Sequence, residues 1–459
     1  MQRPAHIVML AIGLLSLVAL SAVAHKRLSI HSSDNHFVYQ ADAWLNGSLS
    51  LTRRPHHQND WASYETLSLK GTSAQKYGST VKGFFVNQSK LKHHFRTLQR
   101  QDVEIPKRDI ASREKHYYVS FPPGPALLLM PFVWLFGYGV NDVLFTVIFG
   151  ALNIMLVFVL VRLVGQRKNS ISPTGDQIWL AVFFAFSTCH FWLAVQGRVW
   201  FTALVVGATF HLLYLIFAWK LKRPFWAGVC LALAFSSRAT LLFSACFIFW
   251  ELWSARKSLK PKQLAHKALL FVIPCLIGGS ALLLVNWIRF DNPLEFGHTY
   301  LAGGNLQRIR DFGLFDSSFI GRNLSAMLTL LPRVSTEAPY VSISKHGMTI
   351  LLSSPALLLL LCRGKTTPLF WRSIGVAGIL LVPILLYQNT GWEQFSFRFL
   401  MDILPLLMVA IATKYQPLNR LTKSLIVLGV LINLFGAITF QRPGFTRLYG
   451  EFLPVFVSF

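Results

Sequence analysis

The sequence predicts an all-α polytopic membrane protein with about 11 transmembrane helices, within a range of about 11 to 13. The chain has 459 residues, of which 53% are hydrophobic and only 14% are charged. Soluble proteins average about 25% charged residues. Apolar runs of roughly 15 to 21 residues recur from end to end, as spanning helices do, whereas barrel strands alternate in short segments.

Each predicted span is one of these apolar runs. They are residues 6–24, 142–162, 177–195, 199–219, 224–237, 239–253, 268–288, 346–362, 373–389, 398–413 and 424–440. The runs 224–237 and 239–253 are short, so we expect them to tilt or to pair around Arg238. The first run, with Arg3 and "AVA" at 22–24, fits either a cleaved secretory signal or a retained helix. We expect a retained helix.

Positive charge predicts the topology. Five short loops hold many Lys and Arg and no Asp or Glu: residues 162–168, 220–223, 255–267, 363–372 and 414–423. Short basic loops stay cytoplasmic. The five lie on one side only if 124–137 is interfacial or re-entrant rather than spanning, and the preceding "FPPG" suits such a turn. We therefore expect a multi-pass protein of the plasma (inner) membrane, with its N-terminus inside and its C-terminus outside.

This topology divides the chain into five parts. They are the first transmembrane helix 1–24, an extracytoplasmic loop 25–141 with juxtamembrane helices, a transmembrane bundle 142–288, a second extracytoplasmic loop 289–345, and C-terminal transmembrane helices with a short external tail, 346–459. In the first loop, "YETLSLKG" and "STVKGFFV" alternate and predict a small β-hairpin. Phe37, Ala41 and Trp44 predict a helix over 35–46, with Gly47 as its stop.

Polar residues gather on the predicted outer side. They lie in the segments 31–42, 116–124, 196–200, 236–240, 286–300 and 391–402. Ionisable residues at membrane depth are costly and usually mark a pathway or a site. Alternative roles stay open: Asp34 as a helix cap, Arg198 and Arg238 as cations that snorkel to lipid headgroups, and Glu393 and Asp402 as partners of Arg398.

Cofactor motifs are absent from the sequence. It contains no Walker loop, dinucleotide fingerprint or G-x-S-x-G elbow in a strand-to-helix context. All five cysteines lie in apolar runs, and the tandem His56–His57 and His93–His94 lack ligand spacing. We expect no cofactor and no metal site, although a divalent cation is compatible with the chemistry. The net charge of +25 indicates cytoplasmic loops and anionic membrane lipids rather than nucleic acid.

Several segments, in their order, resemble a known family. These are "SSDNHFVYQADAWLNGSLSL", "SFPPGPALLLMPFVWLFG", "SSRATLL", "NWIRFDNPLEFGHTY" and "QFSFRFLMDILPLL". Between residue 31 and about 410 the chain resembles integral-membrane glycosyltransferases of the GT-C superfamily, in the family 39-like branch related to protein O-mannosyltransferases and aminoarabinose transferases. The resemblance implies a polyprenyl-phosphate-sugar donor and an essential acid after the first span, which Asp34 matches. Many relatives carry two acids there, but here Asn35 follows, so Asp34 would act alone or with Asp42.

We therefore expect a sugar transfer to an extracytoplasmic glycan, lipid or protein acceptor, with Asp34 as general base. A retaining mechanism needs a second carboxylate about 5 Å away, so one acid favours inversion. The residues expected to bind substrate are Asn35, His36, Tyr39, Asp42, Pro122, Pro123, Arg198, Arg238, Arg289, His298, Tyr300, Glu393 and Arg398. The alternatives are a transporter or lipid-linked-sugar flippase, which favours paired half-repeats and broken helices at mid-membrane, and a non-catalytic envelope protein.

Overall fold

The chain forms two compact units. A computed structural model describes residues 3–57, 59–89, 91–165, 174–301, 306–361, 366–414 and 418–452. The first unit comprises Met1–Asn35, Gly139–Gly279 and Phe312–Phe459, and the second comprises His36–Tyr138 and Ser280–Asp311. The second unit therefore takes most of the first predicted outer loop and the beginning of the second.

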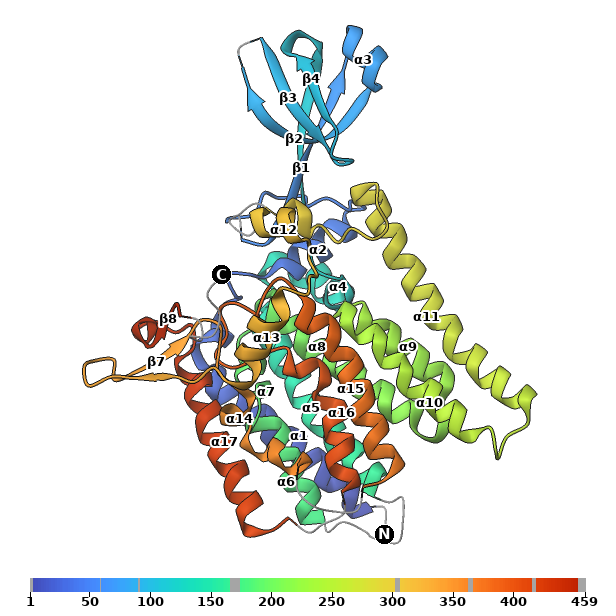
Figure 1. The fold of residues 1–459 in the computed structure, drawn as a ribbon, viewed down its shortest axis with the longest axis vertical. Helices are drawn as coiled ribbons and strands as arrows, with labels where there is room; N and C mark the ends of the chain where they lie inside the picture. The colour runs from blue at the N-terminus through green and yellow to red at the C-terminus, as the bar shows by residue number, and fades with distance from the viewer. Residues whose placement is uncertain are drawn as a thin grey trace. The chain divides into compact units, whose positions relative to one another are not determined.

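The protein is mixed α/β, so the all-α prediction is wrong. A five-stranded antiparallel sheet in the second unit has the order β4-β3-β2-β1-β5 (Figure 1). Its strands are β1 (Trp61–Leu69), β2 (Thr80–Gln88), β3 (Lys92–Thr97), β4 (Asp102–Pro106) and β5 (Ile110–Val119). The predicted hairpin is β1 paired with β2, through partners such as Glu65 and Gly83. The other three strands are short or carry several charges, so they resembled a polar loop in the sequence.

The sheet has its own apolar core. Leu67, Val81, Phe95 and Ile105 are buried together, and α3 (Gly71–Tyr77) joins β1 to β2 beside them. β-Branched and aromatic residues favour such a pleated, half-buried surface. At Gly83 the strands come so close that an added Cβ would stand 2.0 Å from the carbonyl oxygen of Arg96.

Short helices complete the second unit. They are α2 (His36–Leu45), η2 (Lys107–Asp109), α4 (Gly124–Phe136), η3 (Gly137–Gly139), η6 (His298–Tyr300) and α12 (Leu306–Phe312), together with the end of α11. The expected helix over 35–46 forms as α2, and Gly47 follows in the left-handed conformation, with φ 70°. With 13 residues, α4 is too short to cross a membrane alone.

The first unit is a helical bundle. In the described part of the chain, six helical segments are long and apolar enough to span a membrane: His6–Ser29, Asp142–Gly165, Val199–Leu221, Pro261–Phe290, Pro368–Leu386 and Arg420–Thr439. The corresponding helices are α1 (Arg3–Ala24, followed by η1, His25–Ser29), α5 (Asp142–Gly165), α8 (Val199–Ala218, followed by η4, Trp219–Leu221), α11 (Pro261–Phe290), α15 (Pro368–Leu386) and α17 (Arg420–Thr439). Six such segments replace the eleven predicted from the apolar runs.

The other five predicted spans form shorter or interrupted helices. These are α6 (Thr174–Phe186) with α7 (His190–Ala194), α9 (Pro224–Phe235), η5 (Ala239–Ser244) with α10 (Ala245–Ala255), α14 (Ile350–Ser353) with η7 (Pro355–Leu360), and α16 (Leu400–Thr413). Hydroxyl side chains and prolines explain the breaks. Thr188 Oγ1 donates to the carbonyl of Phe184 at 2.7 Å after α6, and Ser237 Oγ donates to that of Leu233 at 2.9 Å after α9. Such bonds offer the backbone an alternative to the helix, and Pro355 lacks an N–H.

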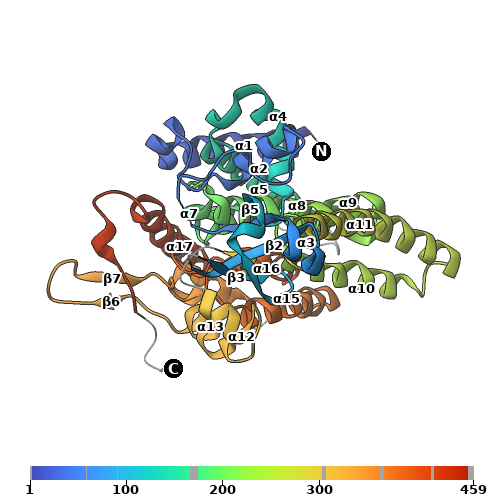
Figure 2. The ribbon, with the colours of Figure 1, turned by 90° about the horizontal axis from the view of Figure 1, so that it is seen from above.

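Polar side chains join helices inside the bundle. Asn153 of α5 donates to the carbonyl of Val205 in α8, and Thr209 donates to Asn153 Oδ1 at 2.6 Å. Thr146 and Thr202 bond at 2.7 Å across the same pair of helices. Helix α9 packs beside α8 (Figures 1 and 2). These four buried side chains, Asn153, Thr209, Thr146 and Thr202, thus find partners on the neighbouring helix, as packing in an apolar environment favours.

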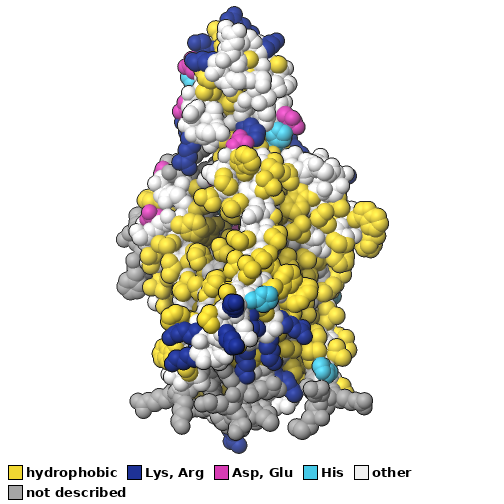
Figure 3. Space-filling model, turned by 90° about the vertical axis from the view of Figure 1, so that its right-hand side faces the viewer, with side chains coloured by type: hydrophobic (Ala, Val, Ile, Leu, Met, Phe, Trp, Pro, Cys, Tyr) yellow, Lys and Arg dark blue, Asp and Glu magenta, His cyan; other side chains and the backbone are white. Residues whose placement is uncertain are grey.

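Basic residues border the apolar surface. Residues 220–223 and 255–262 supply exposed lysines and arginines, and a band of Lys and Arg lies along one edge of the apolar surface in Figure 3. The three other predicted basic loops lie partly in 166–173, 362–365 and 415–417, outside the described residues. The first unit also contains α13 (Phe319–Leu328), η8 (Thr446–Leu448) and a small sheet of β6 (Arg333–Val334), β7 (Val341–Ser344) and β8 (Tyr449–Gly450).

Candidate functional site

Asp34 lies in the first unit, in a short segment that follows α1 and η1. Its carboxylate accepts a hydrogen bond from Ser33 Oγ at 2.7 Å and stands 3.5 Å from Nη1 of Arg198. The Asp34 side chain is only 6% exposed, whereas that of Arg198 is 25% exposed. The N–H of Val199 donates to the carbonyl of Asp34 at 2.9 Å. The acid is therefore tied to the first turn of α8 by both side chain and backbone.

A second acid, Asp142, holds this segment in place. It is the first residue of α5 and is buried. Its carboxylate accepts bonds from the N–H of Ser32 at 2.7 Å, from Ser32 Oγ at 2.5 Å and from the N–H of Arg198 at 3.2 Å. Asp142 thus fixes the residues before Asp34 and the backbone of its partner Arg198. Sequence reasoning missed it, since its only signal was an acid at the start of an apolar run.

The backbone around Arg198 is strained. Gly197 and Arg198 both have positive φ, 64° and 61°. A Cβ on Gly197 would meet Val143 Cγ2 at 2.8 Å, so α5 leaves room only for glycine there. Arginine is rare in the left-handed region, and such strain concentrates at functional sites. Asn35, also buried, lies with its Nδ2 3.4 Å from His31 Nδ1.

Arg238 pairs with an acid in the bundle. Its Nε and Nη2 donate to Asp402 at 3.2 and 2.8 Å, and Thr240 Oγ1 donates to the same carboxylate at 2.9 Å. The Asp402 side chain is only 1% exposed. This ion pair, with its two hydrogen bonds, already balances the charge of Arg238. A phosphate would therefore compete with the buried carboxylate of Asp402 for the guanidinium. The structure thus joins the predicted clusters 236–240 and 391–402.

Arg398 and Glu393 have separate surroundings. The guanidinium of Arg398 lies over the ring of Phe201, in the first turn of α8, at 5.7 Å, and the backbone N–H of Arg398 donates to Gln394 Oε1 at 3.0 Å. Glu393 accepts from Gln441 Nε2 at 3.0 Å and stands 3.8 Å from Lys345. Arg398 therefore approaches the same helix end as Arg198, while Glu393 belongs to another set of contacts.

The second unit gathers aromatic and histidine side chains around α2. The ring of His36 stacks on Trp61 at 3.7 Å, and its Nε2 lies 3.0 Å from the carbonyl of Asn59. Tyr39 meets Trp61 edge to face at 5.5 Å. Phe121 meets both His36 and His298 edge to face, at 6.4 and 6.0 Å. Three of the predicted substrate residues of this unit, His36, Tyr39 and His298, thus share one aromatic cluster.

Asp42 is a hydrogen-bond acceptor on α2. Tyr138 and Thr52 donate to its Oδ2 at 2.6 and 2.7 Å, and the guanidinium of Arg53 lies 4.3 Å from the centre of the Tyr138 ring. Burial, followed by the bond to Asp42, raises the pKa of Tyr138 to about 12. Asp42 therefore has structural partners within the second unit, whereas Asp34 belongs to the first.

The remaining predicted residues of the second unit support its backbone. Arg289 donates to the carbonyl of Val119 at 3.1 Å and to Asn286 Oδ1 at 2.6 Å. Pro122 and Pro123 precede α4, and the carbonyl of Pro123 accepts from Leu127. Tyr300 lies against the sheet.

The predicted site residues are divided between the two units. The first unit holds Asp34, Asn35, Arg198, Arg238, Glu393 and Arg398, and the second holds His36, Tyr39, Asp42, Pro122, Pro123, Arg289, His298 and Tyr300. Among the described residues, no group of three or more His, Cys, Asp or Glu could hold a metal ion. No family model, curated protein or solved structure matches this chain.

Proposed function

We propose that this protein is a membrane glycosyltransferase of the GT-C type, similar to the family 39-like branch. It would transfer a sugar from a polyprenyl-phosphate donor to an acceptor on the extracytoplasmic side. One observation carries the proposal: the carboxylate of Asp34 lies 3.5 Å from the guanidinium of Arg198 at one end of a bundle of apolar helices. In this proposal Asp34 is the base, Arg198 is the cation that binds the donor phosphate, and the lipid-linked donor reaches both.

The proposed reaction is a single displacement. Asp34 takes the proton of the acceptor hydroxyl as that oxygen attacks the anomeric carbon of the sugar. The bond from the anomeric carbon to the phosphate oxygen breaks, and the polyprenyl phosphate leaves with the electron pair. Arg198 binds the leaving phosphate through its fork of N–H donors. Asp142 positions both groups without touching the substrate.

The other arginines fit this scheme unequally. Arg398 lies near the first turn of α8 and is the second cation that could approach a donor phosphate. Arg238 keeps its proposed role in donor binding only if phosphate displaces Asp402, with which it already forms two hydrogen bonds. Its loss would therefore leave a buried carboxylate unpaired, and the effect on stability would exceed the effect on donor binding.

The proposed location follows from charge. Helix α8 begins beside Asp34 and is followed at its other end by the basic residues 220–223. Short basic loops stay cytoplasmic. On this basis Asp34 would face the extracytoplasmic side of a plasma (inner) membrane.

Asp34→Asn tests the proposal. Asparagine keeps the shape of the side chain and can still accept from Ser33 Oγ, and Arg198 is partly exposed to solvent, so the protein should fold. It cannot accept the proton, so the rate of transfer from labelled polyprenyl-phosphate sugars to envelope extracts should fall by about 100-fold or more. Arg198→Lys should retain part of the activity, because lysine keeps the charge but lacks the fork.

Asp311→Asn, which changes an exposed acid in α12, is the matched control and should transfer at the parental rate. A well-folded Asp34→Asn protein with parental activity would exclude Asp34 as the base. A transporter would instead move the labelled donor across proteoliposomes and leave the sugar–phosphate bond intact.

A further inference from the structure

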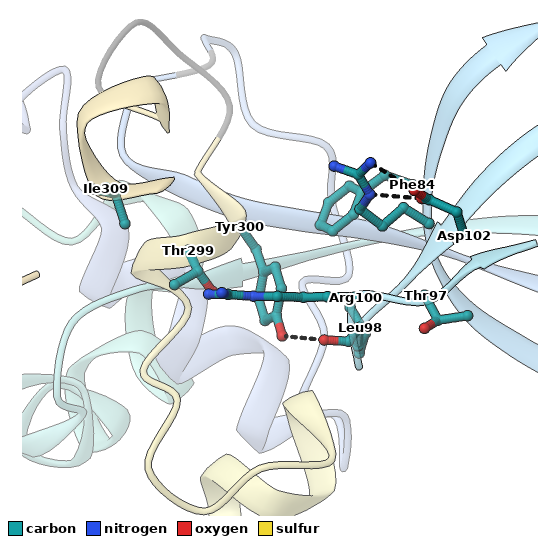
Figure 4. Close-up of a pocket in the computed structure, with 9 residues that line it drawn as sticks. Phe84, Thr97, Leu98, Arg100, Asp102, Thr299, Tyr300 and Ile309 are labelled. Carbon is teal, nitrogen blue, oxygen red and sulfur yellow. Dashed lines mark hydrogen bonds and ion pairs between the residues drawn. The ribbon is translucent and has the colours of Figure 1, made fainter. Parts of the chain in front are cut away.

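A cavity of about 300 Å³ opens in the second unit, between the sheet and the residues Thr299, Tyr300 and Ile309. Phe84, Arg96, Thr97, Leu98, Arg100, Asp102, Thr299, Tyr300 and Ile309 line it (Figure 4). Ligand pockets run from about 300 to 1,000 Å³, so this cavity has room for a small ligand or one unit of a longer chain. It contains none of the residues to which the proposed transfer assigns a chemical step.

Two aromatic rings form an apolar wall of the cavity. Phe84 and Tyr300 lie with their centroids 5.5 Å apart and tilted by 34°. The Tyr300 hydroxyl donates to the carbonyl of Leu98 at 3.4 Å, which holds its ring against the sheet. The faces of aromatic rings are electron-rich and attract weakly positive C–H groups. Such a wall suits the C–H face of a sugar ring.

Two arginines and one aspartate are the charged residues that line the cavity. Arg96 donates to Asp102 through Nε and Nη2, at 2.7 and 2.8 Å, so these two groups neutralise each other. The nearby Glu295 accepts from Thr299 Oγ1 and from the N–H of Gly297, both at 2.6 Å. Arg100 is exposed and extends from the β3–β4 turn toward Thr299 and Tyr300 in Figure 4.

Arg100 also occupies an unfavourable backbone position. Its φ is 65°, in the left-handed region, and its N–H donates to the carbonyl of Thr97 to close the turn. Hairpin turns usually place glycine or asparagine at such a position. An arginine at this position strains the backbone, although a glycine or asparagine would form the turn with less strain. Backbone strain of this kind concentrates at functional sites.

We propose that this cavity binds a saccharide unit that carries a carboxylate or a phosphate. Arg100 would bind the anionic group through its planar fork, Tyr300 and Phe84 would pack against the sugar ring, and the Thr97 and Thr299 hydroxyls would meet sugar hydroxyls. The inference concerns binding alone and does not rest on the proposed transfer. It would give the second unit a role in holding an acidic envelope glycan.

Binding to the full-length protein tests this inference. The protein is placed in nanodiscs of zwitterionic lipid, and calorimetry measures the binding of a hexuronate trisaccharide, a hexose phosphate, the neutral hexose trisaccharide and inorganic phosphate. We expect the trisaccharide that carries carboxylates, the phosphorylated sugar, or both to bind saturably. The neutral trisaccharide and inorganic phosphate should bind at least about tenfold more weakly.

Arg100→Asn is the decisive variant, because asparagine tolerates the left-handed conformation and the turn should persist. It should weaken binding of the anionic saccharide at least about tenfold. Tyr300→Leu should weaken it similarly, while Tyr300→Phe keeps the ring and most of the binding. The matched control Lys107→Gln removes an exposed charge from η2, which joins β4 to β5 outside the cavity, and should change nothing.

Three results would overturn the inference. Parental affinity in a folded Arg100→Asn protein would exclude the cavity. Equal affinity for inorganic phosphate and the phosphorylated sugar, with no binding of the hexuronate, would identify a bare anion site. Failure of all four probes to bind would exclude an anionic saccharide. Hydrogen exchange in β3 and β4 verifies folding of each variant, and Arg100→Gly replaces Arg100→Asn if that variant is unfolded.

Discussion

Asp142 is a buried carboxylate whose partners are two backbone N–H groups and one hydroxyl. Asp142→Asn puts an NH₂ group where one oxygen accepted, so at least one buried donor loses its acceptor. We expect the free energy of unfolding to fall by about 2 kcal/mol. Unfolding of the detergent-solubilised protein by sodium dodecyl sulfate measures this. Asp311→Asn serves as the control, and an unchanged midpoint for Asp142→Asn would show that the carboxylate does not hold the segment.

Single residues were predictable where their type alone suggests chemistry. Asp34 and Arg198 were both expected at the site, and the structure brings them together. Asp142 and Arg100 could not be found in this way. The role of Asp142 depends on burial at the start of α5, and that of Arg100 on a backbone angle, and neither property is visible in the sequence.

Among the elements, the β2–β3 contact offers the sharpest test of the sheet. Gly83→Ala would force a Cβ to within 2.0 Å of the Arg96 carbonyl oxygen. The strands would have to separate, at a cost of about 2 kcal/mol or more. We expect faster hydrogen exchange in 80–97 and weaker saccharide binding in the neighbouring cavity.

Gly321→Ala in α13 is the matched control, since nothing lies within 4 Å of the added Cβ and alanine favours helix. Exchange in 80–97 should remain parental in this variant. Equal protection of the sheet in the Gly83→Ala protein would contradict the close approach of β2 and β3.

Element type was predictable only where a local pattern was strong. Alternation revealed β1 and β2, and helical spacing revealed α2. Strands β3 and β4 have only 6 and 5 residues, too few to establish a period. Apolar composition indicated spans at 177–195 and 346–362, but hydroxyl bonds at Thr188 and the ring of Pro355 divide these runs. Composition records how apolar a run is, not where its backbone bonds end.

For the whole molecule, the topology predicts which segments face which side of the membrane. In a background without the five native cysteines, single cysteines at Gln75 and Phe315 should react with an impermeant maleimide in intact cells. Cysteines at Lys260 and at Ser170, which lies outside the described residues, should react only after lysis. Labelling of position 170 in intact cells would mean that 124–137 crosses the membrane.

Two arginines, Arg27 and Arg442, link the end of α1 to the end of α17 by hydrogen bonds. Arg27 donates to the carbonyls of Phe440 and Gln441, after α17, at 2.9 and 3.1 Å, and Arg442 donates to the carbonyl of Val23 in α1. These bonds link residues that lie 413 to 419 positions apart in the sequence. Chains are synthesised at about 5–20 residues per second, so on the order of 20 to 80 seconds pass between the synthesis of α1 and that of α17. During that interval Arg27 lacks two of its acceptors, the carbonyls of Phe440 and Gln441. A chain that stops before α17 would therefore never form the bonds between Arg27 and the carbonyls of Phe440 and Gln441.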